Sequence, residues 1–213
     1  MHTLQSSATQ HFLQLEEQHG AHNYHPLPVV ISRGQGVHLW DVAGKRYFDY
    51  LSGYSAVNQG HCHPAIVEAL VAQAGKLTLT SRAFYNDQLG PYEQFVTQYF
   101  GYDKVLPMNT GVEAVETAIK LARRWAYEVK GVKDGTAKII VCRNNFHGRT
   151  STVISFSTDP SAYAHFGPYM PGFIHVPHGD ADALAEALKD ESVAAFLVEP
   201  IQGEAGVMVP QEG

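Results

Sequence analysis

The sequence predicts an α/β fold in which helices alternate with the strands of a parallel sheet. The main observation is a change of rhythm at Lys104, after which predicted strands and helices follow each other up to Glu199. Such alternation is typical of parallel strands joined by right-handed crossovers. A second observation is the apolar, largely β-branched run Ile139–Cys142, which indicates a buried strand. A small α+β segment is predicted to precede this sheet.

The composition excludes two classes of partner. The chain has 213 residues, of which 45% are hydrophobic and 17% charged, and this is enough to bury a sizeable core. Its net charge of −6 provides no basic field for a nucleic acid. No segment reaches the ~18 apolar residues that span a bilayer. We therefore expect neither a nucleic acid nor a membrane as partner.

The basic residues and the cysteines favour the cytoplasm. No Lys or Arg precedes Arg33, which argues against a signal peptide and against an Arg-rich transit peptide. Cys62 and Cys142 are too few for a disulfide scaffold, so a reducing compartment is expected.

Residues 1–63 are predicted to form the first segment. A short helix from Ser7 to Gln18 comes first, with Gly20 as its C-terminal cap. A proline-marked extended stretch follows. Three short strands then form an antiparallel meander, and their predicted ranges are Val29–Ser32, Val37–Trp40 and Arg46–Tyr50.

Residues 64–213 are predicted to be the beginning of a larger domain. Pro64 opens a helix, and a second helix covers Gln88 to Phe100 with one apolar face directed inward, formed by Tyr92, Phe95, Val96 and Tyr99. Strands are expected at Lys104–Met108, Lys138–Cys142, Phe173–Val176 and Val193–Glu199, and helices at Val112–Val129 and Asp182–Lys189. The chain stops after a loop at Gly213, so we expect a longer protein with an incomplete sheet here.

The loop after Cys142 is the first candidate site. It carries Asn144, Asn145, Phe146, His147 and Arg149 at the carboxyl end of a strand, where open α/β sheets place their ligands. A flat ring three residues from a planar cation suits a flat cofactor beside an anionic substrate. An ordinary surface loop whose aromatic residue packs into the core is the alternative.

The turn Asn109–Ala114 is the second candidate site. Thr110 is a suitable N-cap and Glu113 completes a capping box, while Gly111 allows a close approach to the backbone. The unpaired amides and the helix dipole of a first turn form an anion site. The alternative is a capped helix that binds nothing.

Other candidates are weaker. Glu199 and Glu204 follow the last predicted strand, where they belong either to a site or to a solvated rim. Tyr24 and Tyr54 lie in loops, with core packing as the alternative. His61-Cys62-His63 is not expected to bind a metal, because adjacent ligands cannot all face one ion.

Seven segments carry a resemblance to a known family. They run from about His19 to the last residue and read GAHNYHPLPVVISRG, YLSGYSAVNQGHCHP, LTSRAFYN, VLPMNTGVEAVETAIKLARRWAYEVKG, NNFHGRT, STDPSAYAHFGPYMPGF and AAFLVEPIQGEAGV. On these segments the sequence resembles the ornithine aminotransferases, which are class-III, fold-type-I transaminases. The resemblance implies a parallel-rich sheet with helices on both faces and pyridoxal 5'-phosphate as cofactor.

The resemblance also implies roles for single residues. Three residues match the turn that holds the cofactor phosphate, Thr110, Gly111 and Val112. Phe146 matches the ring stacked on the cofactor, and Glu199 a carboxylate of the cofactor's hydrogen-bond network. His147 is expected to line the site without a fixed catalytic role.

Four further residues match substrate-binding positions. Arg149 matches the arginine that holds the substrate carboxylate, as its forked guanidinium allows. Tyr24 and Tyr54 match tyrosines of the substrate pocket. Glu204 matches a glutamate that pairs with a second arginine.

The implied reaction moves the δ-amino group of ornithine to the cofactor and then to 2-oxoglutarate. The products are glutamate semialdehyde, which cyclises to pyrroline-5-carboxylate, and glutamate, and a homodimer or higher homo-oligomer is implied. No lysine of the chain lies in a motif matching the Schiff-base lysine, so no catalytic residue is assigned and the chain alone is expected to be inactive. An acetylornithine or 4-aminobutyrate aminotransferase is the alternative within the family. A non-catalytic binding fragment is the alternative outside it.

Overall fold

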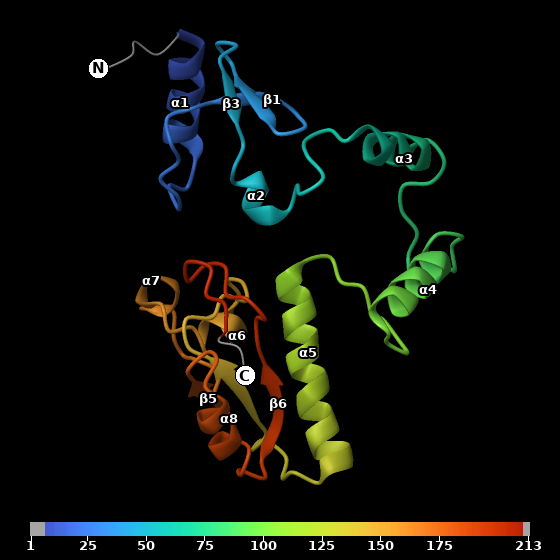
Figure 1. Cartoon of the computed structure of the whole chain (residues 1–213), viewed down its shortest axis with the longest axis vertical. Coiled ribbons are helices and arrows are strands. Elements are labelled where there is room, and N and C mark those ends of the chain that lie inside the picture. The colour runs from blue at the N-terminus through green and yellow to red at the C-terminus, as the bar shows by residue number, and fades with distance from the viewer. Residues whose placement is uncertain (1–6, 211–213) are drawn as a thin grey trace. The chain divides into compact units, whose positions relative to one another are not determined.

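The computed structural model describes residues 7–210, which form two compact units that meet in the sequence between Tyr92 and Glu93 (Figure 1). Each unit has its own elements and its own hydrogen-bond network. The predicted division at residues 63 and 64 concerns domains of the complete protein, and it stays a prediction.

The first unit begins with a helix and a meander, as the sequence predicts. Helix α1 covers Ser7–His19. The strands are β1 (Ile31–Gln35), β2 (His38–Asp41) and β3 (Arg46–Phe48), and they pair antiparallel in the order β1-β2-β3. The Asp41 carboxylate fixes the β2–β3 turn by accepting hydrogen bonds from the amides of Ala43 and Lys45, each 2.9 Å long, and from the Tyr47 hydroxyl at 2.7 Å.

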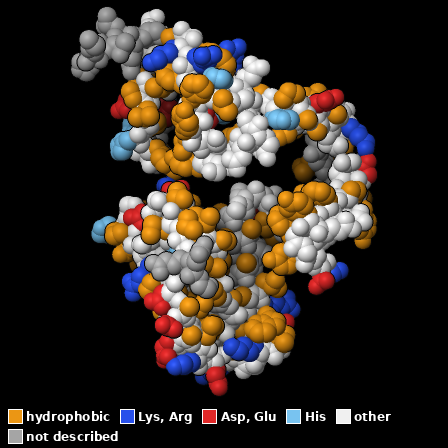
Figure 2. Space-filling model, in the orientation of Figure 1, with side chains coloured by type: hydrophobic (Ala, Val, Ile, Leu, Met, Phe, Trp, Pro, Cys, Tyr) orange, Lys and Arg blue, Asp and Glu red, His pale blue; other side chains and the backbone are white. Residues whose placement is uncertain are grey.

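Two helices with apolar faces follow the short turn α2 (Ser52–Ser55). They are α3 (Pro64–Ala74) and α4 (Leu89–Phe100), close to their predicted bounds. The prediction that Tyr92, Phe95 and Tyr99 point inward is wrong, because all three are exposed, and Val96 is only partly buried. Figure 2 shows apolar side chains gathered on this segment. Helical spacing identifies an apolar face, but no described residue buries this one.

The second unit contains a parallel sheet covered by helices on both faces. Strand β4 (Lys138–Cys142) lies between β5 (Phe173–Val176) and β6 (Val193–Leu197), and both neighbours are parallel to it. The helices are α5 (Gly111–Trp125), its π-helical continuation η1 (Ala126–Lys130), α6 (Ser151–Ile154), α7 (Pro160–Tyr163) and α8 (Ala181–Ala187).

The side chains of β4 alternate between two apolar clusters. Ile139 and Val141 pack with Ile119 of α5, Val153 of α6 and Phe156. Ile140 and Cys142 pack on the opposite face, where residues of α8 join them, Ala183, Leu184 and Ala187. This arrangement confirms the α/β prediction with helices on both faces.

The prediction of a strand at Lys104–Met108 is wrong. The segment forms no strand, and Leu106 is exposed. A β-strand needs a neighbour to receive its backbone hydrogen bonds, and the sheet of described residues contains only β5, β4 and β6.

Candidate active site

The carboxyl ends of β4 and β6 lie at the same sheet edge, because the two strands are parallel and Val141 is paired with Leu197. Two buried amides fix the loops that leave this edge. The Asn145 side chain donates to the carbonyls of Cys142 at 2.7 Å and Phe156 at 3.0 Å. Gln202, which is 2% exposed, donates to the Arg143 carbonyl at 2.8 Å. The loops after the two strands are thereby joined.

Glu199 connects the β6 loop to Phe146. Its carboxylate accepts a 3.1 Å hydrogen bond from the Phe146 amide, and its carbonyl accepts one from His178 at 3.1 Å. Burial raises the pKa of the Glu199 carboxyl, and the negative charge of Glu204 raises it further, against the opposing effect of the Phe146 amide. The Phe146 ring is 41% exposed although its backbone is held in place. This ring therefore offers an apolar surface at the strand end.

The capping box predicted at the start of α5 is present. Thr110 is extended, and its hydroxyl accepts from the Glu113 amide at 3.2 Å. Space is open next to Gly111, where a side chain would meet no atom within 4 Å. The amides of Gly111 and Val112 precede the first intrahelical donor, the Ala114 amide, which bonds to the Thr110 carbonyl, so this turn can bind an anion.

The aromatic loop and the α5 turn lie against each other. Gly148 has φ +118°, and a Cβ added there would lie 2.6 Å from a Val112 methyl, so only glycine allows this approach. The Thr150 hydroxyl also bonds to the Glu116 carboxylate of α5. Two stretches that the sequence predicts as separate candidate sites are thus brought together. Arg149 lies between these two contacts along the chain and is exposed.

His147 follows Phe146 in the chain and is in contact with the core. Its ring centroid is 5.8 Å from that of Phe156, and its Nε2 is buried with no hydrogen-bond partner among the described residues. Burial lowers the pKa of this imidazole. A neutral histidine is therefore favoured at this position.

Sequence reasoning missed Gln202, and it named Asn145 only as a member of the loop, without the buried role that its side chain has. An amide in a polar loop has no distinctive spacing. Gln202 could have been found from its position in the sequence, because it lies between Glu199 and Glu204 in the loop that follows the apolar strand β6.

The remaining candidates lie in the first unit. Tyr24 and Tyr54 are exposed there, and their roles stay predictions. His61, from the triplet His61-Cys62-His63, binds the Asp49 carboxylate. Over residues 7–210, no group of His, Cys, Asp and Glu is arranged to hold a metal ion, and no helix is long and apolar enough to cross a membrane.

Comparison with known proteins shows which family has this sequence. The family profile described as Aminotransferase class-III matches residues 19–213. A Drosophila melanogaster protein named "Ornithine aminotransferase, mitochondrial" is 65% identical over 198 residues, which are 93% of this chain and 46% of that protein.

Two solved structures are also similar. The ornithine aminotransferase from Toxoplasma gondii ME49 superimposes with a TM-score of 0.95 at 52% identity, over 99% of this chain and 49% of that one. An acetylornithine aminotransferase from Elizabethkingia anophelis gives a TM-score of 0.83 at 66% identity, over 96% and 50%. The chain spans about half the length of the relatives it matches.

The cytoplasmic prediction is wrong. The similar proteins from Drosophila melanogaster, Rattus norvegicus and Caenorhabditis elegans are all named as mitochondrial. The prediction used the residues before Arg33, and these do not report on targeting in a chain that spans half of its relatives.

Proposed function

The chain belongs to the class-III aminotransferase family, and we propose that the complete protein transfers the δ-amino group of ornithine to 2-oxoglutarate with pyridoxal 5'-phosphate as cofactor. The observation that carries this proposal is the packing of the Phe146–Thr150 loop on the first turn of α5. This packing puts an anion site and an exposed aromatic ring on adjoining segments.

The residues present fit the cofactor. The open turn at Gly111 and the amides of Gly111 and Val112 suit its phosphate, with Thr110 holding the turn. The Phe146 ring suits the face of its pyridine ring, and Glu199 anchors the backbone of that residue. When bound, the cofactor supplies an electron sink for the carbon whose amino group is exchanged.

The substrate is held by charge and by shape in this proposal. Arg149 binds the substrate carboxylate in two parallel hydrogen bonds. Tyr24 and Tyr54 line the pocket, and Glu204 pairs with a second arginine. The reaction partners are ornithine, 2-oxoglutarate and glutamate.

A steady-state assay of the full-length protein tests the proposal. We expect glutamate to form from ornithine and 2-oxoglutarate, with a higher kcat/KM for ornithine than for N-acetylornithine. Tyr24→Ile is expected to reduce this preference, and Tyr50→Ile is the control, because Tyr50 is a tyrosine of the same unit that has no proposed substrate contact and is more exposed than Tyr24 (93% against 54%). A preference for the acetylated substrate would overturn the proposal.

Acetylornithine transfer is the second candidate function. The 66% identity to the Elizabethkingia anophelis protein favours it. The same assay decides between the two, because the acetyl group changes only the α-amino end of the substrate.

We also propose that the complete protein is a homodimer and that the 213 residues alone are inactive. The coverage of about half of each relative supports the second statement, since the cofactor lysine is then expected outside these residues, and the first statement rests on the resemblance to the family alone. Turnover by the 213-residue chain would contradict the second statement, and a monomeric mass by light scattering would contradict the first.

A further inference from the structure

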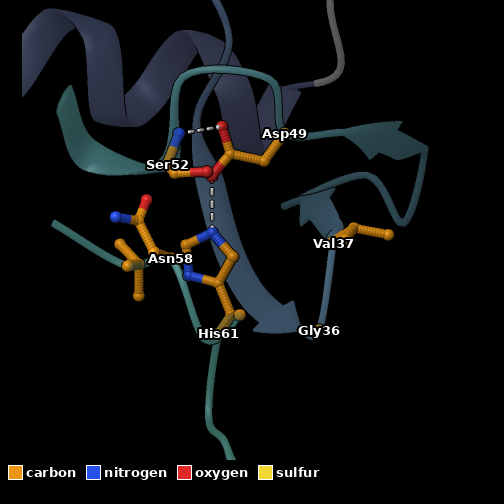
Figure 3. Close-up of a pocket in the computed structure, with 8 residues that line it drawn as sticks. Gly36, Val37, Asp49, Ser52, Asn58 and His61 are labelled. Carbon is orange, nitrogen blue, oxygen red and sulfur yellow. Dashed lines mark hydrogen bonds and ion pairs between the residues drawn. The ribbon is translucent and has the colours of Figure 1, made fainter. Parts of the chain in front are cut away.

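A carboxylate–imidazole pair lies outside the site described above, in the first unit. His61 Nε2 and Asp49 Oδ2 are 2.6 Å apart, and both side chains are partly buried. The other oxygen of Asp49 accepts hydrogen bonds from the amides of Leu51 and Ser52, each 2.9 Å long. Figure 3 shows the carboxylate between the His61 ring and the Ser52 nitrogen. The bond to His61 lowers the pKa of the Asp49 carboxyl, which favours the charged acceptor.

Both members of the pair are anchored to the meander. The Asp49 amide donates to the Val37 carbonyl at 2.9 Å. His61 exchanges two backbone hydrogen bonds with Gly36, of 2.8 and 2.9 Å. A Cβ added at Gly34 would lie 2.8 Å from the His61 side chain, so the imidazole is packed directly on β1. The pair therefore closes residues 50–60 into a loop with fixed ends.

The loop contains a left-handed turn. Four consecutive residues have positive φ, namely Ser52 at 51°, Gly53 at 58°, Tyr54 at 57° and Ser55 at 65°. This conformation is unfavourable for residues with a side chain, and glycine alone adopts it readily. Strained backbone persists where its surroundings determine it, and the Asp49 bonds lie at the entry of this turn.

Tyr54 is held by this turn. Its side chain is 69% exposed, so packing does not fix it, and its direction depends on the backbone that carries it. We propose that Asp49 and His61 are positioning residues that hold Tyr54 where it contacts the substrate. This inference rests on the proposed function, which assigns Tyr54 to the substrate pocket.

Asp41 provides a matched control for Asp49. Its carboxylate also accepts from two backbone amides and one side chain, in the same unit, but it fixes the β2–β3 turn instead of the Tyr54 loop. Asp41→Ala and Asp49→Ala therefore remove similar bonding from different loops.

The first measurement is hydrogen–deuterium exchange on the full-length protein, which needs no substrate. Asp49→Ala is expected to speed exchange of the amides of residues 51–57, and Asp41→Ala only that of residues 42–47. His61→Leu leaves the two amide bonds to Asp49 in place and is expected to act in the same direction more weakly, which covers the case that Asp49→Ala does not fold. Unchanged exchange at 51–57 in both variants of the pair would overturn the proposal.

The second measurement is a double-mutant cycle on ornithine turnover. With the cofactor at saturation, Asp49→Ala is expected to raise the KM for ornithine about tenfold, the equivalent of the lost hydrogen bonds. The affinity for the cofactor is expected to stay unchanged. In a Tyr54→Ala background, Asp49→Ala is expected to add nothing, because it acts through Tyr54. Additive effects, or an equal rise in KM for Asp41→Ala, would overturn the positioning role. Absence of ornithine turnover in the unsubstituted protein would refute the proposed function and the substrate part of this inference, while exchange still decides what holds the turn.

Discussion

The sheet of the second unit and the helices α3 and α4 are both rich in apolar residues, but their burial is opposite. Strand β4 is buried on both faces by α5, α6 and α8. Helices α3 and α4 have no buried residue, although their apolar side chains keep helical spacing. The difference shows that a periodic pattern identifies which face is apolar and leaves open what covers it. The covering element has to be found in the structure.

The largest expected effect comes from the buried side of this comparison. Phe156 is fully buried and packs on Phe173, with ring centroids 4.5 Å apart. We expect Phe156→Ala to lower the free energy of unfolding by about 3–5 kcal/mol, through lost transfer energy and a cavity. Urea unfolding of the 213-residue chain measures this loss.

Phe95→Ala is the matched variant on α4, where the side chain is 64% exposed. In the same chain we expect a change within about 0.5 kcal/mol. A loss as large as that of Phe156→Ala would break the comparison, because it would show that the α4 face is covered.

The buried amide of Asn145 gives the next largest effect. Asn145→Ala removes a donor from the carbonyls of Cys142 and Phe156, and the Phe156 carbonyl keeps its contact with the His175 imidazole. We expect a loss of about 1–3 kcal/mol, the usual result of an unsatisfied buried polar group. Asn144→Gly is the control from the neighbouring exposed position, because Asn144 has φ +58°, which glycine adopts readily, and its expected loss is below about 1 kcal/mol. Equal losses would show that burial does not separate the two asparagines.

Removal of a helix cap is expected to lower the free energy of unfolding equally in both regions. Thr110 caps α5, and Asn86 accepts from the amides of Gln88 and Leu89 at the start of α4. Alanine at either position is expected to lower the free energy of unfolding by about 1 kcal/mol, because a cap acts on its own helix end. Thermal unfolding of the two variants checks this. A difference above about 1 kcal/mol between the losses of the two variants would show that the contribution of a cap also depends on how well its helix is packed.

The sheet was predictable from the sequence where a strand has partners within the chain. Strands Lys138–Cys142 and Phe173–Val176 form with the predicted bounds, because their β-branched runs pair with each other. Lys104–Met108 has a similar apolar content but stays unpaired. A single segment carries no information about whether its neighbour is present.

The site was predictable in its parts and not in its connections. The sequence predicts the cap at Thr110 and the aromatic loop at Phe146 separately. Their contact depends on Gly148 facing Val112, which is a tertiary relation. The left-handed turn at Tyr54 was missed for a similar reason, because Gly53 is the only one of its four residues that marks a positive φ.

The smallest expected effect is the pH dependence due to His147. Burial lowers the pKa of its imidazole below the ordinary 6.5, whereas an unfolded chain has the ordinary value. Between the two pKa values the unfolded state binds more protons, so the free energy of unfolding decreases as the pH falls from 6.5 towards the folded pKa, and it is unaffected above 6.5. His147→Gln removes this dependence. We therefore expect the variant to lose less stability than the unsubstituted chain between pH 7 and pH 5 in urea unfolding, and the difference is small because the imidazole is only partly buried. Equal losses over this range would mean that the strand-end loop is open to water, and that it resembles the exposed α3–α4 segment more than the sheet beside it.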